Sequence, residues 1–308
     1  MIRVAITGAG TPDSGELIRL LAMHPDVEIT AARCEALQGK SLAAIHHGLI
    51  GETSLTFTSS ADFPKCDVLF VGGDDLPAAE LMRLRTDRPE LKIIMLNDPE
   101  LPDPERFGIV YGLPEINRKL LVRGATAAVV PRPFASMALV ALFPFAKHLL
   151  LGGKIEISVA APAAILDATD IAKTEREIEK ALLSVQSSFT GNVSISTHVS
   201  EARRSALMDI SFGCPLSLQQ MIDLYEIYDD HRFSFVTTSS VGVSEVAGTN
   251  KCVVRVSRGD KPGECSIGVA ADCRLRGGAG EAVHIMNLMC GLHEKTGLNL
   301  KAIDFEPV

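Results

Sequence analysis

A cluster of glycines lies between the first apolar run of the chain and the helix-like segment that follows it. Gly8 and Gly10 come directly after Arg3–Thr7, Thr11 is next, and Gly15 lies further along. A glycine turn between a strand and a helix lets backbone N–H groups face a pyrophosphate at the helix N-terminus. The spacing GxGxxxxG departs from the usual dinucleotide fingerprint. We expect a dinucleotide at this turn, and a plain strand-to-helix turn is the alternative.

The charged residues near this turn give opposite indications. Asp13 would repel a bound phosphate, but a carboxylate at a helix N-cap is stabilising without any ligand. After the second expected strand an NAD site places an acidic residue for the ribose hydroxyls, whereas this chain has Arg33. A guanidinium suits the 2′-phosphate of NADP. Arg33 therefore favours NADP over NAD, and the alternative is a solvated surface arginine.

Composition limits the kind of protein and its partners. The seven cysteines are scattered without CxxC spacing, which is typical of free thiols in a reducing compartment and not of a disulfide framework or a metal site. The apolar, uncharged stretch 133–146 is too short to span a bilayer, and no leader precedes the first strand. We therefore expect a cytoplasmic protein with no membrane partner. A net charge of −8 without a basic stripe argues against nucleic acid.

The elements that position the glycine turn alternate between strands and helices. This alternation predicts the α/β class, with a Rossmann-type doubly wound parallel sheet. The expected strands are Arg3–Thr7, Val27–Ala31, Leu55–Thr58, Asp67–Val71, Lys92–Leu96 and Ala127–Val130, and the expected helices are Ser14–Met23 and Leu76–Arg85.

The pattern changes from Lys154 onward and predicts a second, α+β domain. Its expected strands, taken as antiparallel, are Ile155–Ala160, Val193–His198, Phe233–Thr237, Cys252–Val256 and Glu264–Ala271. The expected helices are Phe134–Leu150, Ala172–Ser187 and Gly280–Leu292. We expect the Rossmann domain to span 1–132 and 281–308, and the α+β domain to span 133–280.

Three long motifs carry a family resemblance, and they occur in the family's order. They are the glycine turn with Gly15–Leu21, Val110–Arg118 (VYGLPEINR), and Gly278–Met289. The chain resembles N-acetyl-γ-glutamyl-phosphate reductase, a semialdehyde dehydrogenase of arginine biosynthesis that reduces an acyl phosphate with NADPH. The resemblance implies NADP, or NAD, as cofactor. It also implies nucleotide contacts at Gly72, Gly280 and Asn287.

The family's nucleophile is missing. Its cysteine begins a helix, where the dipole favours the thiolate that attacks the acyl phosphate to give a thioester. The motif N-P-G-C-[YF]-x-T corresponds here to Val130–Ser136, so Pro133 holds the cysteine position and Arg132 replaces a glycine. Proline has no nucleophilic atom and is favoured in the first turn of a helix. The resemblance therefore implies that no thioester can form.

Other parts of the family's substrate site are reduced or kept. The Gly/Ser-rich loop corresponds to Ala160–Leu166, which has few polar donors, and only Glu177 survives from the H-x-H-x-P-E segment. The chain there is shorter than the family pattern by roughly two dozen residues. His198 occupies the position of the family's general acid/base, and Arg204 that of a residue gripping a carboxylate or phosphate. A structural histidine on a strand is the alternative for His198.

Substitute nucleophiles are poorly supported. Cys214 is the only cysteine flanked by turn residues, but it lies well downstream of His198. Ser136 lies one helical turn after Pro133, and without an adjacent base we expect a helix-surface hydroxyl.

Three functions stay open from the sequence. The first is a reductase relative that binds NADP(H) without thioester chemistry. The second is an active oxidoreductase on a small carbonyl compound, with direct hydride transfer and His198 as proton donor. The third is a non-catalytic subunit of an active reductase. In relatives the sheet of the second domain builds a dimer interface, so the resemblance implies a homodimer or homotetramer.

Overall fold

The computed structural model describes residues 1–59, 65–73, 76–96 and 104–302. The chain separates into two compact units. The first comprises Met1–Pro131 and Gly278–Asn299, so the chain returns to it near its end. The second comprises Arg132–Gly277 and the described residues after Asn299.

The first unit is built on a six-stranded sheet in which all neighbouring strands are parallel. The strand order is β2-β1-β3-β4-β6-β5. The strands are β1 (Ile2–Thr7), β2 (Val27–Ala32), β3 (Val68–Val71), β4 (Lys92–Met95), β5 (Ile109–Tyr111) and β6 (Ala127–Val129). The helices are α1 (Pro12–Ala22), α2 (Leu42–Ile45), α3 (Ala78–Asp87), α4 (Pro114–Val122) and α9 (Ala279–Met289), with short 3₁₀ helices η1 (Glu35–Leu37), η2 (His47–Leu49) and η3 (Pro104–Phe107).

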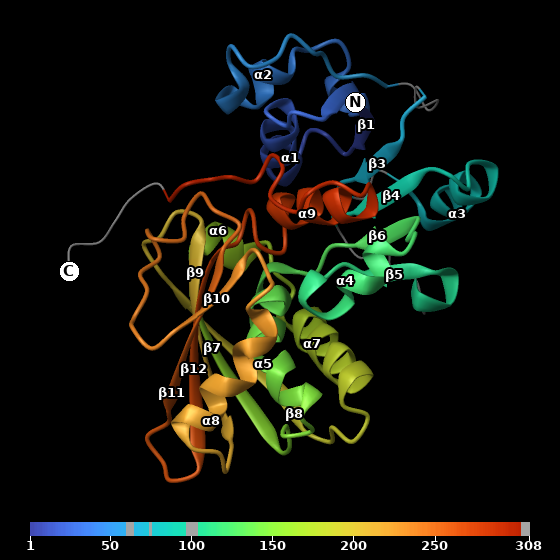
Figure 1. The fold of residues 1–308 in the computed structure, drawn as a ribbon. Coiled ribbons are helices and arrows are strands. Elements are labelled where there is room, and N and C mark those ends of the chain that lie inside the picture. Colours follow the sequence, from blue (N-terminus) through green and yellow to red (C-terminus); the bar gives the residue numbers. More distant parts are fainter. Residues whose placement is uncertain (60–64, 74–75, 97–103, 303–308) are drawn as a thin grey trace. The chain divides into compact units, whose positions relative to one another are not determined.

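The strand order of this sheet reverses at β1. The chain leaves β1 through α1 to reach β2 on one side, and β3 then pairs with the other side of β1. Ligands of such sheets bind outside the carboxyl ends of the strands at this reversal. In Figure 1, α1 and α9 lie beside this sheet, and both helices bury an apolar stripe. The predicted α/β class with a Rossmann-type sheet is therefore confirmed.

The second unit contains a mixed six-stranded sheet with the order β10-β11-β12-β9-β7-β8. Its strands are β7 (Lys154–Ala161), β8 (Asn192–Val199), β9 (Ser205–Gly213), β10 (Ser234–Thr237), β11 (Cys252–Arg258) and β12 (Glu264–Asp272). Its helices are α5 (Pro133–Lys147), α6 (Ala163–Asp167), α7 (Ile171–Val185) and α8 (Leu218–Asp223), followed by η4 (Leu224–Tyr228). The apolar helix α5 runs along this sheet (Figure 1).

The two faces of the second sheet differ because side chains alternate along each strand. The ring of Phe212 in β9 packs edge-on against Phe145 of α5, with centroids 5.0 Å apart, so one face is covered by α5. Leu207 lies on the opposite face, which we call the outer face. Residues paired across strands share a face, and the row that contains Leu207 comprises His198, Ala160, Leu207, Ala270, Val253 and Phe235. A neighbouring row of the outer face places Asp209, Gly268 and Arg255 side by side.

Several expected elements need correction. Leu55–Thr58 is not a strand, because this segment forms only single bridges, between Arg33 and Thr58 and between Ser41 and Thr56. The second sheet is mixed and not purely antiparallel, since β7 pairs in parallel with β8 and β10 with β11. Two strands, β5 and β9, were not expected at all.

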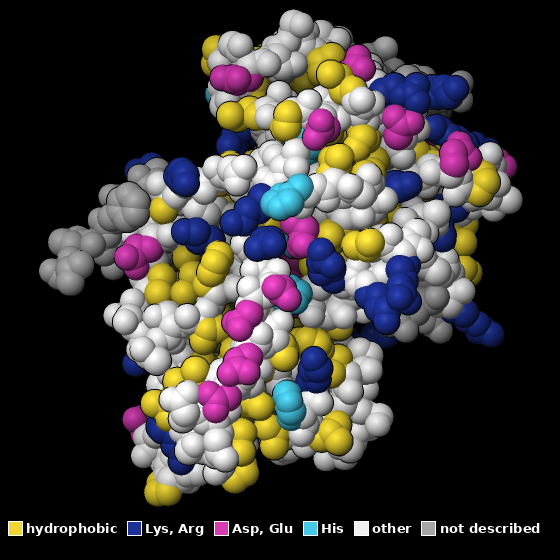
Figure 2. Space-filling view, viewed as in Figure 1, with side chains coloured by type: hydrophobic (Ala, Val, Ile, Leu, Met, Phe, Trp, Pro, Cys, Tyr) yellow, Lys and Arg dark blue, Asp and Glu magenta, His cyan; other side chains and the backbone are white. Residues whose placement is uncertain are grey.

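No helix among the described residues is long and apolar enough to span a membrane. On the face that Figure 2 shows, basic and acidic side chains both occur over each unit, in keeping with the absence of a basic stripe in the sequence.

Candidate functional site

The glycine turn lies at the strand reversal of the first sheet, where β1 and β3 end side by side. Gly8 has a left-handed φ of +59°. A Cβ atom on Gly8 would lie 1.8 Å from the carbonyl oxygen of Gly72, and one on Gly72 would lie 2.5 Å from Oγ of Ser14. The structure therefore brings together two glycines predicted as nucleotide contacts, Gly8 and Gly72, and the close packing of their backbones excludes any side chain.

Two carbonyl groups of the turn, those of Gly8 and Ala9, accept hydrogen bonds from other residues of the first unit. The Gly8 carbonyl accepts hydrogen bonds from Oγ of Ser14 at 2.9 Å and from the N–H of Thr11 at 3.3 Å. The Ala9 carbonyl accepts one from Nε2 of His46 at 2.7 Å. Among the described residues the N–H of Gly10 has no acceptor. The turn thus offers the N–H of Gly10 as a donor while the carbonyls of Gly8 and Ala9 are engaged, an arrangement that fits a pyrophosphate.

The start of α1 differs in detail from the sequence interpretation. Thr11, and not Asp13, is the N-cap, and its Oγ1 accepts a hydrogen bond from the N–H of Ser14 at 3.2 Å. Asp13 is an exposed residue of the first turn, where its charge favours the helix dipole. Gly15 lies inside α1 and not in the turn; a Cβ there would lie 2.5 Å from Nδ1 of His46.

Arg33 follows β2 directly and is tied to the turn through its backbone. Its N–H donates to Ile6 at 2.7 Å, and its carbonyl accepts from the N–H of Ala9 at 2.9 Å. The Nε and Nη1 atoms of its side chain are buried. The alternative of a fully solvated surface arginine does not describe these two atoms, and the expected contact of Arg33 with a 2′-phosphate stays a prediction.

The two predicted nucleotide contacts in α9 are buried in the first unit. Asn287 has no exposed surface, and Gly280 is buried. The amide of Asn287 is fully used: Oδ1 accepts from Nε2 of His24 at 3.1 Å, and Nδ2 donates to the carbonyls of Glu294 and Thr296 at 3.2 and 2.9 Å. Asn287 therefore connects the segment that follows α9 to the helix itself. The predicted contact of Asn287 with a nucleotide stays a prediction.

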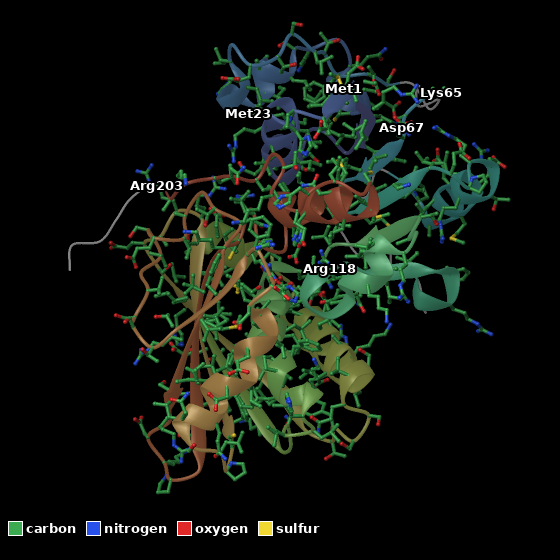
Figure 3. All side chains as sticks on the ribbon, in the orientation of Figure 1. Met1, Met23, Lys65, Asp67, Arg118 and Arg203 are labelled. Atoms are coloured by element: carbon green, nitrogen blue, oxygen red, sulfur yellow. The ribbon has the colours of Figure 1, made fainter. Side chains whose placement is uncertain are left out.

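A second hydrogen-bond network, partly buried, lies beside Asn287. Glu294 accepts hydrogen bonds from Nη2 of Arg118 at 2.7 Å and pairs with Nε2 of His284 at 2.9 Å. Arg118 is labelled in Figure 3. Burial opposes the charge of Glu294, but the hydrogen bonds from His284 and Arg118 prevail and lower its pKa to about 2. This network joins α4, α9 and the segment after α9.

The first turn of α5 is the place where the resemblance puts the nucleophile. Pro133 is the first helical residue and Arg132 is the N-cap. The backbone of Gly277 lies against Pro133, since a Cβ on this glycine would be 2.3 Å from Cα of Pro133. The position is therefore filled by a ring without a nucleophilic atom and closed on one side by backbone.

Arg132 is held in place by Glu177 of α7. Its N–H donates to Oε1 at 3.1 Å, and its guanidinium Nη1 donates to Oε2 at 2.7 Å. Glu177, the one survivor of the family's H-x-H-x-P-E segment, is thus a partner of the arginine that replaces a glycine.

Two further glutamates of α7 accept hydrogen bonds from the edge strand β8: Glu175 from the N–H of Ile195 and Glu179 from that of Val193.

Ser136 is not the helix-surface hydroxyl expected from the sequence. It has no exposed surface, and its Oγ accepts a hydrogen bond at 2.8 Å from Nε of Arg276, which is fully buried as well. The reason is that α5 packs on the sheet along nearly its whole length and buries this turn.

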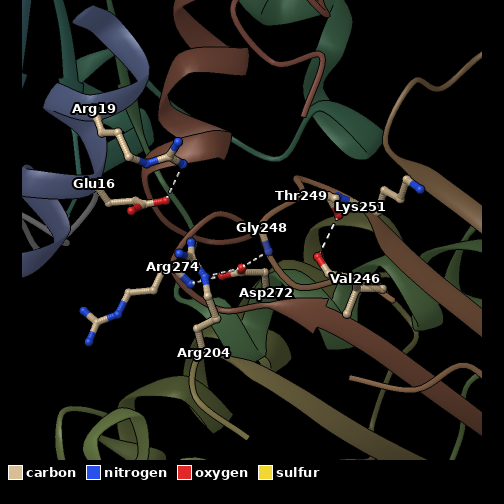
Figure 4. Close-up of polar contacts among 9 residues, drawn as sticks. All are labelled: Glu16, Arg19, Arg204, Val246, Gly248, Thr249, Lys251, Asp272 and Arg274. Carbon is tan, nitrogen blue, oxygen red and sulfur yellow. Dashed lines mark hydrogen bonds and ion pairs between the residues drawn. The ribbon is translucent and has the colours of Figure 1, made fainter. Parts of the chain in front are cut away.

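Arg204 and His198 lie at the same end of the second sheet but are held differently. Arg204 donates through Nε to Asp272, which also accepts from the N–H of Gly248 at 2.7 Å (Figure 4). Burial raises the pKa of Asp272, against the effect of Arg204. His198 is exposed in the edge strand β8, on the outer face. Because α5 covers the opposite face, the sheet places His198 and α5 on different sides.

The thiols of the second unit do not offer a substitute nucleophile. Cys214, Cys252, Cys265 and Cys273 are buried. Burial raises the pKa of Cys265 to about 12 and raises that of Cys273 as well, which suppresses the thiolate. Among the described residues no group of three or more His, Cys, Asp and Glu side chains could hold a metal ion.

Comparison with known proteins relates this fold to that of the semialdehyde dehydrogenases. Residues 3–123 match the family model described as the NAD-binding domain of semialdehyde dehydrogenase. Two solved structures are similar over 94% of this chain and 98% of their own, each with 14% sequence identity. One is aspartate semialdehyde dehydrogenase II of Vibrio cholerae, with a TM-score of 0.70. The other is aspartate semialdehyde dehydrogenase of Candida albicans with NADP, with a TM-score of 0.69. The fold is that of the semialdehyde dehydrogenases, and it includes a domain for a nicotinamide nucleotide.

The similarity to individual sequences identifies the family. The N-acetyl-gamma-glutamyl-phosphate reductase of Parabacteroides distasonis is 31% identical over 326 residues, and that of Azobacteroides pseudotrichonymphae is 32% identical over 322 residues. Each alignment covers 99% of this chain and 100% of the relative. The chain belongs to the N-acetyl-γ-glutamyl-phosphate reductase family. Both alignments are longer than the chain's 308 residues, so these relatives contain residues that it lacks.

Several residues that bind the predicted site residues were not predicted from the sequence. In the sequence Glu177 is only the survivor of the H-x-H-x-P-E segment and Arg132 only the replacement of a glycine, whereas the structure pairs them. Neither His46 nor Asp272 belongs to a motif identified in the sequence. An Asp at the end of a strand that neighbours Arg204 is visible only once β9 and β12 are paired, so no local signal pointed to it.

Proposed function

We propose that this chain is a reductase-family protein that binds NADP(H) and has lost the covalent thioester step. The single observation that carries the second half is the first turn of α5. There Pro133 begins the helix, Gly277 lies against it, and Arg132 is paired with Glu177. An acyl phosphate meets no sulfur at this position, so it cannot be held covalently.

The nucleotide half of the proposal is supported by the turn of the first unit. Gly8, Gly10, Thr11 and Gly72 would hold the pyrophosphate, with the N–H of Gly10 as a donor and the close Gly8–Gly72 pair leaving room for the backbone to approach it. When bound, the nicotinamide ring supplies a hydride. Arg33 after β2, where an NAD site would place an acid, supports NADP over NAD.

Calorimetric titration tests the binding half. We expect saturable binding of NADPH to the purified chain and at least roughly tenfold weaker binding of NADH, since only NADPH carries the 2′-phosphate. Equal affinity for the two nucleotides would contradict the NADP assignment. No binding of either would remove nucleotide retention altogether.

A turnover assay tests the chemical half. We expect no semialdehyde and no NADPH oxidation when the protein is mixed with N-acetylglutamyl phosphate, whereas an active reductase with its cysteine serves as the positive control. Steady semialdehyde formation by the pure protein would show that the proposed loss of activity is wrong.

The outer face of the second sheet supports the further proposal that the chain associates with a second sheet of the same kind. Leu207 and Phe235 are 37% and 40% exposed on this face. Asp209 and Arg255 flank Gly268 on neighbouring strands, so a two-fold related copy can pair each charge with the opposite one. The partner is a second copy of this chain or an active reductase, and co-purification from cells distinguishes the two.

Direct hydride transfer to a small carbonyl compound stays a prediction from the sequence. His198 is exposed on the outer face, whereas Arg204, the other residue kept from the family site, is engaged by Asp272. Cytoplasmic location is likewise proposed from the seven free thiols.

A further inference from the structure

We propose that His46 is a positioning residue for the pyrophosphate of the bound nucleotide, a role that rests on the proposed nucleotide binding. Its ring holds the carbonyl of Ala9 and thereby leaves the N–H of Gly10 as the group of the turn that meets a phosphate. Neither the glycine pattern nor the resemblance pointed to this residue.

The contact between His46 and the turn is direct. Nε2 lies 2.7 Å from the carbonyl oxygen of Ala9. A carbonyl oxygen can only accept, so Nε2 carries the hydrogen and donates it. The acceptor belongs to the residue between Gly8 and Gly10, at the centre of the turn.

The backbone of His46 and two neighbouring residues fix the position of its ring. Its backbone N–H donates to Leu42 at 2.8 Å, and its carbonyl accepts from the N–H of Leu49 at 2.9 Å, so α2 and η2 set the place of the residue. The ring of the buried Phe57 lies beside it, with centroids 6.0 Å apart. On the remaining side the imidazole rests on Gly15 of α1.

Gly15 has a specific reason to lack a side chain. A Cβ atom there would lie 2.5 Å from Nδ1, 2.9 Å from Cε1 and 3.0 Å from Cγ of His46. Glycine costs about 1 kcal/mol relative to alanine inside a helix. Its presence at a helical position is explained by the space that the imidazole takes beside the first turns of α1.

The Ala9 carbonyl matters because a phosphate oxygen repels carbonyl oxygens and attracts N–H groups. The Gly8 carbonyl is already engaged by Ser14 and Thr11, and the N–H of Ala9 donates to Arg33. The Ala9 carbonyl, in contrast, is held by the side chain of His46, which lies outside the β1–α1 unit. Without the donor at His46, this carbonyl is free to rotate toward the ligand.

The experiment compares two nucleotides in the full chain. NADPH contains the pyrophosphate, whereas adenosine 2′-monophosphate has the adenine and the 2′-phosphate but no phosphate at the 5′ position. We expect His46→Leu to weaken NADPH binding by roughly tenfold, the effect of one positioned hydrogen bond. Affinity for the 2′-monophosphate should change less than about threefold. His46→Gln, which keeps an N–H donor, should restore most of the NADPH affinity.

Gly15→Ala provides a second route if His46→Leu does not fold. Its methyl group displaces the ring without removing it and should also lower the affinity for NADPH more than that for the 2′-monophosphate. Equal weakening of both ligands, or unchanged affinity for NADPH, would overturn the positioning role. A native protein that binds no NADPH would overturn the proposed function itself, and it is recognised before any variant is measured.

Discussion

At the first turn of α5, the proposed loss of thioester chemistry depends on a single residue, Pro133. Pro133 occupies the position at which a helix N-terminus would stabilise a thiolate, and Arg132 is held beside it by Glu177. The helix is in place and its first turn is well packed. Under the proposed function, the thioester step is absent because this turn carries a proline ring and no thiol sulfur.

A cysteine placed at this position should therefore be reactive. We expect Pro133→Cys to react with iodoacetamide at neutral pH at least roughly tenfold faster than a buried thiol, because the helix N-terminus and Arg132 both lower the pKa of a thiol there. Ser136→Cys is the matched control, since Ser136 is one turn further along and has no exposed surface. Equal rates for the two variants would show that this turn does not activate a thiol.

Glu294 permits a prediction about pH. Its pKa is lowered to about 2 from 4.5, since hydrogen bonds from His284 and Arg118 outweigh its burial. A lowered pKa contributes stability above the unfolded value, and this contribution is lost as the pH falls from about 5 toward 2. We expect Glu294→Gln to reduce the free energy of unfolding by about 1–2 kcal/mol at pH 7, after allowance for solvent screening at the half-exposed Arg118.

Urea unfolding at pH 7 and pH 3 measures this effect, and the difference between Glu294→Gln and the native chain should shrink at pH 3. Glu156→Gln removes the exposed pair with Lys154 and serves as control, with no measurable change expected at pH 7. A difference at Glu294 that is the same at both pH values would contradict the pKa assignment.

At the scale of elements, the glycine turn connects sequence and fold most directly. Gly8 and Gly39 both have a left-handed φ, of +59° and +77°. Around Gly39 a Cβ would meet nothing within 4 Å, whereas at Gly8 it would collide with Gly72. We expect Gly39→Ala to cost about 1 kcal/mol in unfolding free energy and Gly8→Ala more than about 3 kcal/mol. Similar losses for both, measured by urea unfolding, would refute the close approach of β1 and β3.

The sequence predicted elements well where periodicity was strong and local. The strands β1, β4 and β12 lie within one residue of their expected bounds, because apolar runs with clear ends define them. Leu55–Thr58 has the residue types of a strand but finds only single bridges, since pairing depends on distant segments. The strand β9 was not predicted, although its buried residues Ala206, Met208, Ile210 and Phe212 alternate with the period of two that is typical of a strand.

The site could be predicted only in part for a similar reason. Gly8 and Gly72 were expected near a nucleotide, and their mutual contact follows from strand order. The pairing of Arg132 with Glu177, and of Arg204 with Asp272, joins residues 45 and 68 positions apart. No short-range pattern encodes such contacts, so only the fold reveals them.

At the scale of the whole molecule, the outer face of the second sheet predicts association. We expect Leu207→Glu to weaken the association of two chains at least roughly a hundredfold, because a buried unpaired carboxylate costs several kcal/mol. Val199→Glu is the control, since Val199 is also exposed but pairs with Ala161 on the opposite face. Light scattering after size exclusion measures the change. A native chain that is monomeric at high concentration would contradict the proposal.

The measurement that tests the central claim most directly is the intact mass of the purified protein after mixing with N-acetylglutamyl phosphate in the absence of nucleotide. Without a hydride donor, a thioester formed by an active reductase accumulates and adds the mass of the acyl group. We expect the mass of this chain to stay unchanged, while an active family member treated in parallel gains the adduct. A stoichiometric acyl adduct on any cysteine of this chain would contradict the loss of covalent chemistry.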